Sequence, residues 1–369
     1  MECPRPGLAR ARLASDPRGD RQSGVVAGAH RLKSSDEVLA AVADAFSHEG
    51  RVAIALSGGG DSAVAAWAIT QLAGPDRVRA IHVHHGLASS DDMAGAADAV
   101  AAHVGIGLTR LDVVVPDGAS FEGKARDVRL AAIENALDDD EIVVTGHHAG
   151  DVAETVIGNL LRGAGATGLG GIASRRGVWH RPLVGVPAAL VADAAAELGI
   201  PFVDDPENTD LRHTRNVIRH RVLPLVEEFA GSAVERVIGR SADALRADDT
   251  ELERLLEGFT VGESAGAAVA GAALLATLPG PLAARAARRL LREAHPPYPG
   301  SSDDVASLLS VARGDTHRVS LSGGYVASRE GPHVAVYIDA PAPSDPTRLE
   351  PGGSARFGAW VLSLVAVGG

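Results

Sequence analysis

The stretch best suited to chemistry is the loop Ser57-Gly-Gly-Gly-Asp-Ser62, which lies between two apolar segments. Residues 52–56 are uniformly apolar, as in a buried strand, and residues 63–72 are apolar at helical spacing. Consecutive glycines let the backbone approach a ligand closely, and amides and hydroxyls at a helix N-terminus attract phosphate. The sequence therefore predicts a phosphate-binding loop between a strand and a helix.

This loop differs from two common phosphate-binding motifs. It lacks the lysine of GxxxxGKS/T and the spacing of GxGxxG. Asp61 would repel a phosphate by itself, and a bridging Mg²⁺ makes the pair favourable, so Asp61 is the candidate metal ligand. The structural alternative is a glycine-rich turn in which Asp61 only caps the helix.

Two carboxylates, Asp151 and Glu154, follow the apolar stretch 141–145 and are three residues apart. That spacing places both on one face at the start of a helix, beyond the carboxyl end of a strand, where open parallel sheets bind ligands. The pair could bind a cation, recognise an ammonium group or act as a base. Alternatively, acidic residues in a first turn only complement the helix dipole.

Arginines gather at two places in a chain whose net charge is −12. Arg126 and Arg129 are three residues apart and share a helix face, which could equally be a solvated charged face. Arg215, Arg219 and Arg221 lie on and around one helix start. The acidic balance argues against general nucleic-acid binding, so positive charge acts only in local patches such as this one.

Composition restricts the class of protein. With 369 residues and 46% hydrophobic content, the chain is long enough for two or three packed domains. No segment approaches the roughly 18 apolar residues of a membrane span, so we expect a cytoplasmic protein without a membrane partner. The single cysteine, Cys3, excludes internal disulfides and paired-cysteine sulfur chemistry.

A zinc site at His82, His84 and His85 is disfavoured because a structural site needs four ligands and no cysteine is near.

Apolar strand patterns alternate with helical patterns through the first part of the chain, at residues 52–56, 78–83, 108–115, 141–145 and 180–184. Such alternation predicts an α/β fold with a parallel, doubly wound sheet. Residues 160–172 are too rich in glycine for a helix, which favours a mobile loop that covers a substrate. Beyond residue 228 the pattern changes to long amphipathic helices and then to short strands.

We therefore expect four regions. Residues 1–34 have no periodic pattern and are expected to be a disordered extension. Residues 35–225 form the α/β domain that carries the loop. An all-helical domain at 226–313 and a small β-rich region at 314–369 follow.

Several of these motifs resemble a known family. SGGGDS resembles the SGGxDS loop of the N-type ATP pyrophosphatases (PP-loop enzymes), which cleave ATP between the α- and β-phosphates. Four further motifs resemble the tRNA(Ile)-lysidine synthetase family, namely HVHHGL at 82–87, ARDVR at 125–129, GHHAGDVAET at 146–155 and LLRGAGATGLGGI at 160–172. The segment DPENTD at 205–210 with RNVIRHRVLP at 215–224 discriminates best, because other members of the superfamily lack it.

The resemblance implies an adenine nucleotide alpha hydrolase-like sheet with strand order 3-2-1-4-5. It also implies ATP-dependent ligation of free L-lysine to C2 of the wobble cytidine in a tRNA(Ile) with a CAU anticodon. An adenylated cytidine is the intermediate, and ATP with Mg²⁺ is required. The helical domain is then expected to bind tRNA. Both a monomer and a homodimer are compatible with the sequence.

The resemblance also implies site residues. ATP binding is expected from Ser57, Gly58, Gly59, Gly60, Asp61, Ser62, His82, Val83, Gly146 and His147. Catalysis is expected from Asp61, Arg126, Arg129, Asp151 and Glu154, with the last two serving the incoming amine. Contacts to tRNA are expected from Arg162, Arg215, Asn216, Arg219 and Arg221.

Two positions depart from the family pattern, and the cysteine content and the charged residues bear on two other functions. His84 stands where the family has asparagine, and Leu130 stands where it has tyrosine, so any contact from that phenol is absent. A tRNA thiolation enzyme of the same superfamily needs cysteines that Cys3 alone does not supply. A nucleotide sensor without catalysis would not need Asp151 and Glu154 together with the Arg215 cluster.

Overall fold

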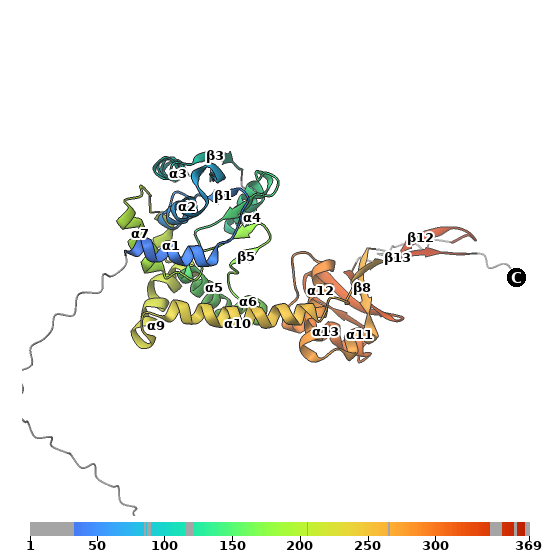
Figure 1. The fold of residues 1–369 in the computed structure, drawn as a ribbon. Coiled ribbons are helices and arrows are strands. Elements are labelled where there is room, and N and C mark those ends of the chain that lie inside the picture. The colour runs from blue at the N-terminus through green and yellow to red at the C-terminus, as the bar shows by residue number, and fades with distance from the viewer. Residues whose placement is uncertain are drawn as a thin grey trace, which may run out of the picture.

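The computed structural model describes residues 33–84, 86, 90–114, 121–204, 206–264, 266–339, 349–357 and 360–365. Within these ranges the chain forms two bodies joined by the long helix α10 (Val234–Arg254), with a separate hairpin beyond the second body (Figure 1). The predicted disordered extension at 1–34 lies almost entirely outside the described residues. Helix α1 begins at Ser34, and the described part contains no helix that is long and apolar enough to span a membrane.

A mostly parallel sheet organises the first body. Its described strands have the order β3-β2-β1-β4-β6-β5. All neighbours are parallel except the short edge strand β5, which is antiparallel to β6. The strands are β1 (Val52–Ala55), β2 (Val78–His84), β3 (Gly107–Asp112), β4 (Ile142–Val144), β5 (Arg175–Arg176) and β6 (Trp179–His180). The order 3-2-1-4-5 is thus observed with β6 as the fifth strand, which is shorter than the predicted 180–184.

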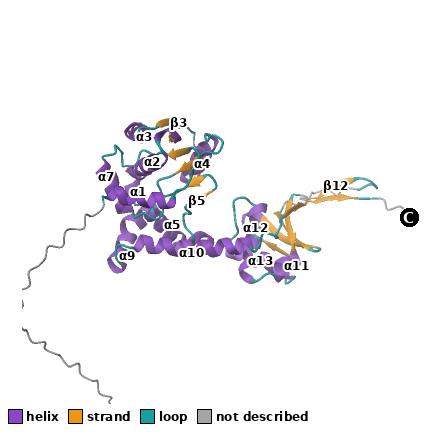
Figure 2. Cartoon of the chain, in the orientation of Figure 1, coloured by secondary structure: helices purple, strands orange, loops and turns teal. Residues whose placement is uncertain are grey.

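Helices cover both faces of this sheet (Figure 2). Val52 and Ile54 of β1 belong to one hydrophobic core, whereas Ala53 between them belongs to another on the opposite face, as the two-residue period of a strand requires. The fold is therefore the predicted doubly wound α/β type. The covering helices include α1 (Ser34–Ala45), α2 (Gly60–Ala73), α3 (Ser90–Val104), α4 (Phe121–Asn135), α5 (Ala149–Leu161) and α7 (Ala188–Leu198).

Two further segments complete the first body. The glycine-rich residues 160–172 were expected to be a loop, yet they contain the short helix α6 (Ala166–Leu169). The arginine-rich segment is helical throughout, with a wide π-helical turn between two α-helical pieces. It follows a 3₁₀ turn, η2 (Pro206–Thr209), and consists of α8 (Thr214–Val217), η3 (Ile218–Val222) and α9 (Leu223–Ala230).

The second body is not divided as the sequence predicted. Its antiparallel sheet has the order β7-β8-β11-β10-β9, so strands from the expected helical region 226–313 pair with strands from the expected β-rich region. The predicted boundary between residues 313 and 314 falls inside one hydrophobic core. The strands are β7 (Gly262–Ser264), β8 (Ala267–Gly271), β9 (Arg318–Ser320), β10 (Tyr325–Glu330) and β11 (His333–Ile338).

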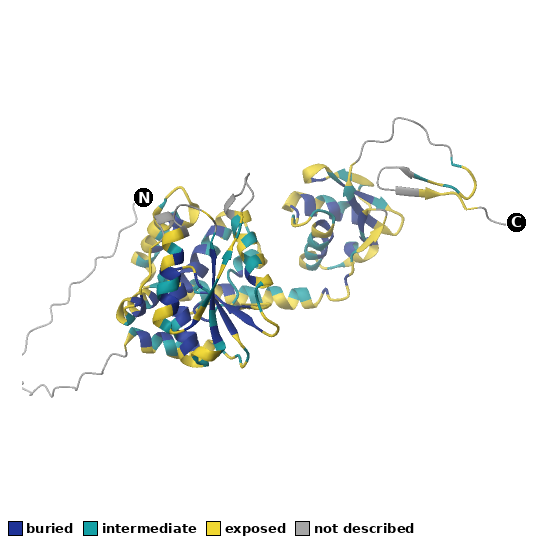
Figure 3. Cartoon of the chain, turned by 90° about the horizontal axis from the view of Figure 1, so that it is seen from above, coloured by how far each residue is buried: buried dark blue, intermediate teal, exposed yellow. Residues whose placement is uncertain are grey.

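Three helices pack on this second sheet, and buried residues form a separate core in each body (Figure 3). Apolar side chains of Leu290, Leu308 and Val336 meet in the second core, which explains why helices and strands form a single unit. The helices are α11 (Ala272–Thr277), α12 (Gly280–Ala294) and α13 (Ser302–Arg313), and β12 (Ser354–Phe357) pairs with β13 (Trp360–Ser363) in the hairpin.

Candidate active site

The loop at 57–62 is held in shape by its two serines. The Ser62 hydroxyl donates to the Gly59 carbonyl (2.9 Å) and accepts from the Ser57 amide (3.2 Å), and the Gly59 amide donates to the Ser57 hydroxyl (3.2 Å). Helix α2 begins at Gly60 directly after this turn. The loop therefore stands at a helix N-terminus, as predicted, where amides and the helix dipole favour an anion.

Two glycines are required here by close packing. Gly58 has φ +95°, and a Cβ on it would lie 2.4 Å from the Met93 carbonyl oxygen. Gly146, directly after β4, would place a Cβ 2.6 Å from the Asp61 carbonyl and from the Ser62 nitrogen. Since backbone atoms cannot move aside cheaply, Gly146 lets the end of β4 rest on the first turn of α2. A Cβ on Gly59, by contrast, would come no closer than 3.5 Å to another residue, the Ser57 hydroxyl oxygen.

Asp61 lies in the first turn of α2 with its side chain half exposed (51%). His148 Nε2 lies 3.5 Å from Asp61 Oδ2, and the His148 side chain is buried. Burial acts to lower the pKa of His148, but the Asp61 and Asp151 carboxylates outweigh it and raise that pKa above 6.5. One accessible carboxylate beside a phosphate loop fits Mg²⁺, which is usually held by one or two carboxylates together with substrate phosphates.

The carboxylates of Asp151 and Glu154 are on α5 and are paired with the arginine-rich segment. Arg215 donates from Nη2 to Asp151 Oδ1 (2.5 Å) and from Nε to Glu154 Oε2 (2.6 Å). Arg219 donates from Nε to Glu154 Oε1 (2.5 Å) and from Nη2 to Oε2 (3.1 Å) and Asp151 Oδ1 (3.2 Å). The remaining oxygen of Asp151 accepts from the His148 amide (2.9 Å). Every oxygen of the two carboxylates is thus engaged.

The depth of these groups determines which of them a ligand meets. The Glu154 side chain is 2% exposed and that of Asp151 is 9% exposed, whereas the Arg215 side chain is 45% exposed. Burial acts to raise the pKa of Asp151, but the cations of His148 and Arg215 outweigh it and lower that pKa below 3.8. The guanidinium groups therefore form the accessible layer, and the carboxylates lie beneath them.

More positive charge converges on this layer. Desolvation, with the nearby Arg126 and Arg215 cations, lowers the pKa of Arg129, although the residue as a whole is exposed. Desolvation lowers the pKa of His147 to about 4, assisted by Arg181, Arg215 and Arg126 and opposed by Asp151. His147 is therefore neutral at pH 7, and its Nδ1 lies 2.7 Å from the Thr145 hydroxyl oxygen. Asp151 and Glu154 compensate Arg215 and Arg219, so the further positive charge of Arg126, Arg129 and Arg181 favours an anion at this place.

His82 and Val83 are on β2 and are buried. The His82 Nδ1–H donates to the Leu56 carbonyl (2.9 Å), which joins the end of β1 to β2 just before the loop. This side chain therefore fixes the strand that leads into the phosphate loop. His85 and Leu87 of the same motif lie outside the described residues.

Comparison with known proteins agrees with this geometry. Residues 31–226 match the family described as a PP-loop domain. The chain is 35% identical over 303 residues to the tRNA(Ile)-lysidine synthase of Nocardia farcinica, an alignment that covers 79% of this chain and 93% of the relative. The chain belongs to the tRNA(Ile)-lysidine synthase family. The family resemblance seen in the sequence is thus confirmed.

Other family members match over a shorter length. The tRNA(Ile)-lysidine synthase of Rhodococcus erythropolis is 38% identical over 216 residues, and the chain spans 65% of its length, which is just under two thirds. That alignment covers 58% of this chain. The fold is also similar to the U34-tRNA thiolase NcsA of Methanococcus maripaludis, with a TM-score of 0.46 and 20% identity over 61% of this chain and 80% of that one.

The residues predicted to bind tRNA lie at different places in this lysidine synthase family member. Arg221 is exposed and makes no ion pair within the described part of the chain. Arg162 is exposed at the end of α5 and donates to Asn159 (2.6 Å), whereas Asn216 is buried and donates to the Asp210 carbonyl (2.9 Å). The structure therefore brings Arg215 and Arg219 to the carboxylates but leaves Arg162 and Arg221 apart from them.

Three residues around the site were not singled out from the sequence. His148 links Asp61 to Asp151, Arg181 faces Arg126, and Glu235 accepts from the Ala188 amide (3.0 Å) close to His148. The motif GHHAGD contains two adjacent histidines, so the sequence alone could have indicated His148 as a site residue. Nothing local marks Arg181 or Glu235, because only the fold brings them to the site.

Proposed function

We propose that this chain forms lysidine by ATP-dependent ligation of lysine to C2 of the wobble cytidine of tRNA(Ile), through an adenylated cytidine. One observation carries the proposal. The segment that distinguishes lysidine synthases from other PP-loop enzymes supplies Arg215 and Arg219, and both pair with Asp151 and Glu154 of the motif after β4. The family-specific segment is therefore built into the nucleotide site and is not an appendage to it.

The first chemical step suits the loop and the arginine layer. Loop amides and the dipole of α2 stabilise the leaving pyrophosphate, where negative charge develops. Asp61 would hold Mg²⁺, which neutralises phosphate charge when it is bound. The cytidine C2 oxygen attacks the α-phosphate and pyrophosphate leaves. Arg126, Arg129 and Arg215 supply the positive charge that faces this phosphate.

For Asp151 and Glu154 we propose a positioning role in place of the expected service to lysine. Lysine attacks as a free amine, and Asp151, whose pKa lies below 3.8, is a weak acceptor for its proton. Both oxygens of Glu154 already accept hydrogen bonds from Arg215 and Arg219. Both carboxylates instead orient the two guanidinium groups that cover them. Loss of either carboxylate is thus expected to impair adenylation as well as lysine transfer.

The proposed substrates are free L-lysine and a tRNA(Ile) with a CAU anticodon, in the cytoplasm. A thiolation reaction on the same fold needs sulfur chemistry, and Cys3 is the single cysteine of the chain. A nucleotide sensor would not need a carboxylate pair that holds two arginines in place. Ligation of lysine is therefore the reaction that these residues support best.

The test combines two measurements on the full chain. Pyrophosphate release from ATP should depend on a tRNA(Ile) transcript with a CAU anticodon, and radiolabelled lysine should enter that tRNA without any sulfur donor. A transcript with uridine at the wobble position is the matched control and should accept no lysine. Lysine incorporation into neither transcript, despite ATP binding, would contradict the proposal.

One variant tests the metal role. Asp61→Asn should reduce pyrophosphate release by about a thousandfold, because the loop loses the carboxylate that would coordinate the metal ion bound to the phosphates. Asp76→Asn is the control, since that residue lies at the other end of α2, in the turn η1 (Pro75–Arg77). Release within a few-fold of the unsubstituted protein in Asp61→Asn would refute the assignment.

A further inference from the structure

Helix α10 touches both bodies of the molecule through one shared carboxylate. Asp249 Oδ1 accepts from the Thr167 hydroxyl of α6 (2.8 Å) and also pairs with Arg285 of α12. The Asp249 and Arg285 side chains are 15% and 13% exposed, so this ion pair is largely shielded from water. A single oxygen thus joins the glycine-rich segment 162–172 of the first body to the second body.

Neighbouring turns of α10 strengthen both attachments. On one side Arg246 donates to the carbonyls of Gly170 and Ile172, the latter at 3.0 Å. On the other side Glu253 pairs with Arg289, and with Arg285 at 3.2 Å. The approach is close, because a Cβ on Gly170 would lie 3.4 Å from the Arg246 Cβ, which is contact distance without a clash.

The segment also leads into the active site. Ala173, directly after Ile172, accepts from Arg181 Nη1 (3.0 Å). Arg181 directly follows β6, which pairs with β4, and the Thr145 amide after β4 donates to the His180 carbonyl (3.0 Å). This cation therefore stands at the same strand ends as His147 and Asp151, and burial, together with Arg126 and Arg176, lowers its pKa. A shift of the segment would therefore move a charge at the site.

We propose that Asp249 is a positioning residue that ties the conformation of segment 162–172, and through it Arg181, to the docking of the second body. Its effect on catalysis rests on the proposed function, whereas its effect on the segment does not. The second body then acts on the reaction without contacting the reacting atoms. No bond is made or broken by Asp249 itself.

The first test needs no activity. Arg285→Gln leaves every residue of the first body unchanged, so any change there must travel through α10. Hydrogen exchange of amides in segment 162–172 should become at least about fivefold faster, the lower end of typical coupling between two sites. Arg318→Gln is the control, because Arg318 pairs with Asp339 within the second body. Exchange in the segment that is unchanged in Arg285→Gln overturns the proposal.

Folding of the variant is checked in the same experiment. Amides of β10 and β11 report whether the second body stays folded, and Arg285→Lys retains the charge if Arg285→Gln unfolds that body. Arg285→Lys should then show a smaller acceleration in segment 162–172, since the ammonium group keeps one contact to Asp249. Unchanged exchange in the segment in a folded Arg285→Lys would equally overturn the proposal.

A double-mutant cycle tests whether Thr167 and Arg285 are coupled because they share the Oδ1 atom of Asp249. Thr167→Val and Arg285→Gln should not be additive in their effect on exchange, nor in kcat, while the KM for tRNA changes less than kcat. Additive effects would mean that the two contacts are independent and would refute coupling through Asp249. If the chain proves inactive with tRNA(Ile), the exchange cycle still decides for or against the coupling.

Discussion

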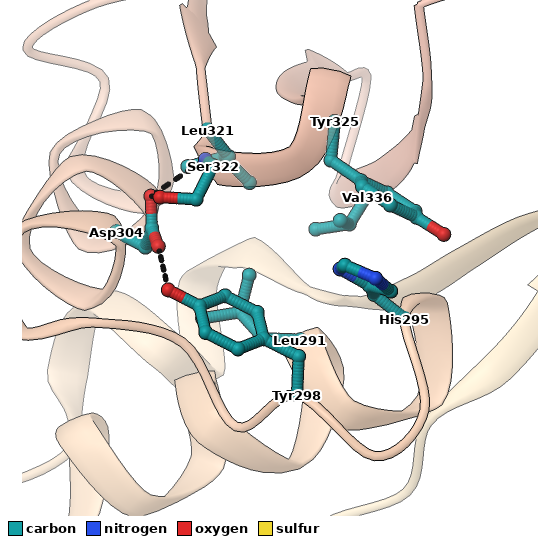
Figure 4. A pocket seen from close by; sticks show the side chains of 8 residues that line it. All are labelled: Leu291, His295, Tyr298, Asp304, Leu321, Ser322, Tyr325 and Val336. Atoms are coloured by element: carbon teal, nitrogen blue, oxygen red, sulfur yellow. Dashed lines mark hydrogen bonds between the residues drawn. The ribbon is translucent and has the colours of Figure 1, made fainter. Parts of the chain in front are cut away.

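Both bodies bury carboxylates, but they satisfy them in opposite ways. Asp151 and Glu154 in the first body are bound by the charged Arg215 and Arg219. Asp304 in the second body accepts from neutral donors, which are the Tyr298 hydroxyl, the Ser301 amide and hydroxyl, and the Ser322 amide and hydroxyl. Figure 4 shows Asp304 between Tyr298 and Ser322, which reach it from either side.

The difference indicates what each network is for. Asp304 holds a helix start in place, since it belongs to the capping box of α13 with Ser301, and none of its partners among the described residues is charged. The arginines of the first body keep exposed surface, so they can hold a carboxylate beneath and an anion above. In these two networks the charged one therefore lies at the candidate site, and the neutral one fixes the start of a helix.

Removal of one charge in the first body should have the largest effect. Glu154→Gln leaves Arg215 and Arg219 with one carboxylate between them. Because both arginines keep contact with solvent, the loss of unfolding free energy should be about 2 kcal/mol, below that of a fully buried pair, and misplaced cations should slow pyrophosphate release by about a hundredfold or more. Denaturant unfolding and single-turnover release measure the two effects.

The control for that variant is Glu251→Gln. Glu251 pairs with Arg254 on α10 at 2.7 Å, but both side chains are more than half exposed. Exposed pairs contribute little, so we expect a change within about 0.5 kcal/mol and normal release. An equally small effect of Glu154→Gln would show that the buried network does not organise the site.

Loss of the Asp304 charge in the second body should change the free energy of unfolding without changing the reaction. Burial acts to raise the pKa of Asp304, but hydrogen bonds from Ser322, Tyr298 and Ser301 outweigh it and lower that pKa to about 2. Because the folded pKa is below the unfolded value of 3.8, this stabilisation is present above about pH 4 and is lost as pH falls toward 2. Its size is on the order of 2 kcal/mol.

The measurement is the pH dependence of unfolding. Asp304→Asn should lose most of the acid-sensitive stability of the second body, while kcat for lysine incorporation stays unchanged below the melting temperature. A variant with the same pH dependence between pH 4 and pH 2 as the unsubstituted chain would contradict this role. A fall in kcat as large as that of Glu154→Gln would remove the distinction between the two bodies.

The smallest effect concerns the arginines that the sequence grouped together. Arg221 is exposed without an ion pair among the described residues, whereas Arg215 is compensated by two carboxylates. Arg221→Gln should reduce the log–log salt slope of tRNA binding by about one unit at most. Arg215→Gln should leave that slope unchanged and instead reduce pyrophosphate release. Equal salt slopes for the two variants would mean that they act alike on RNA.

Much of the fold and of the site was predictable because it depends on local pattern. The uniformly apolar residues 52–56 before three glycines predicted β1, the phosphate loop and α2, all of which are present. Alternation of strand and helix patterns predicted the doubly wound sheet, and short motifs identified the family. These features depend on neighbours within a few residues, where backbone preference and apolar period decide the structure.

Only the tertiary structure decided which partners the predicted residues meet. The i, i+3 spacing placed Asp151 and Glu154 on one face, but the arginines that cover them lie 61 to 68 residues further along the chain. Likewise β8 precedes α12 and α13 in sequence but pairs with β11 after them, which no local pattern shows. Periodicity reports which face of an element is buried, whereas chain topology decides what is packed against that face.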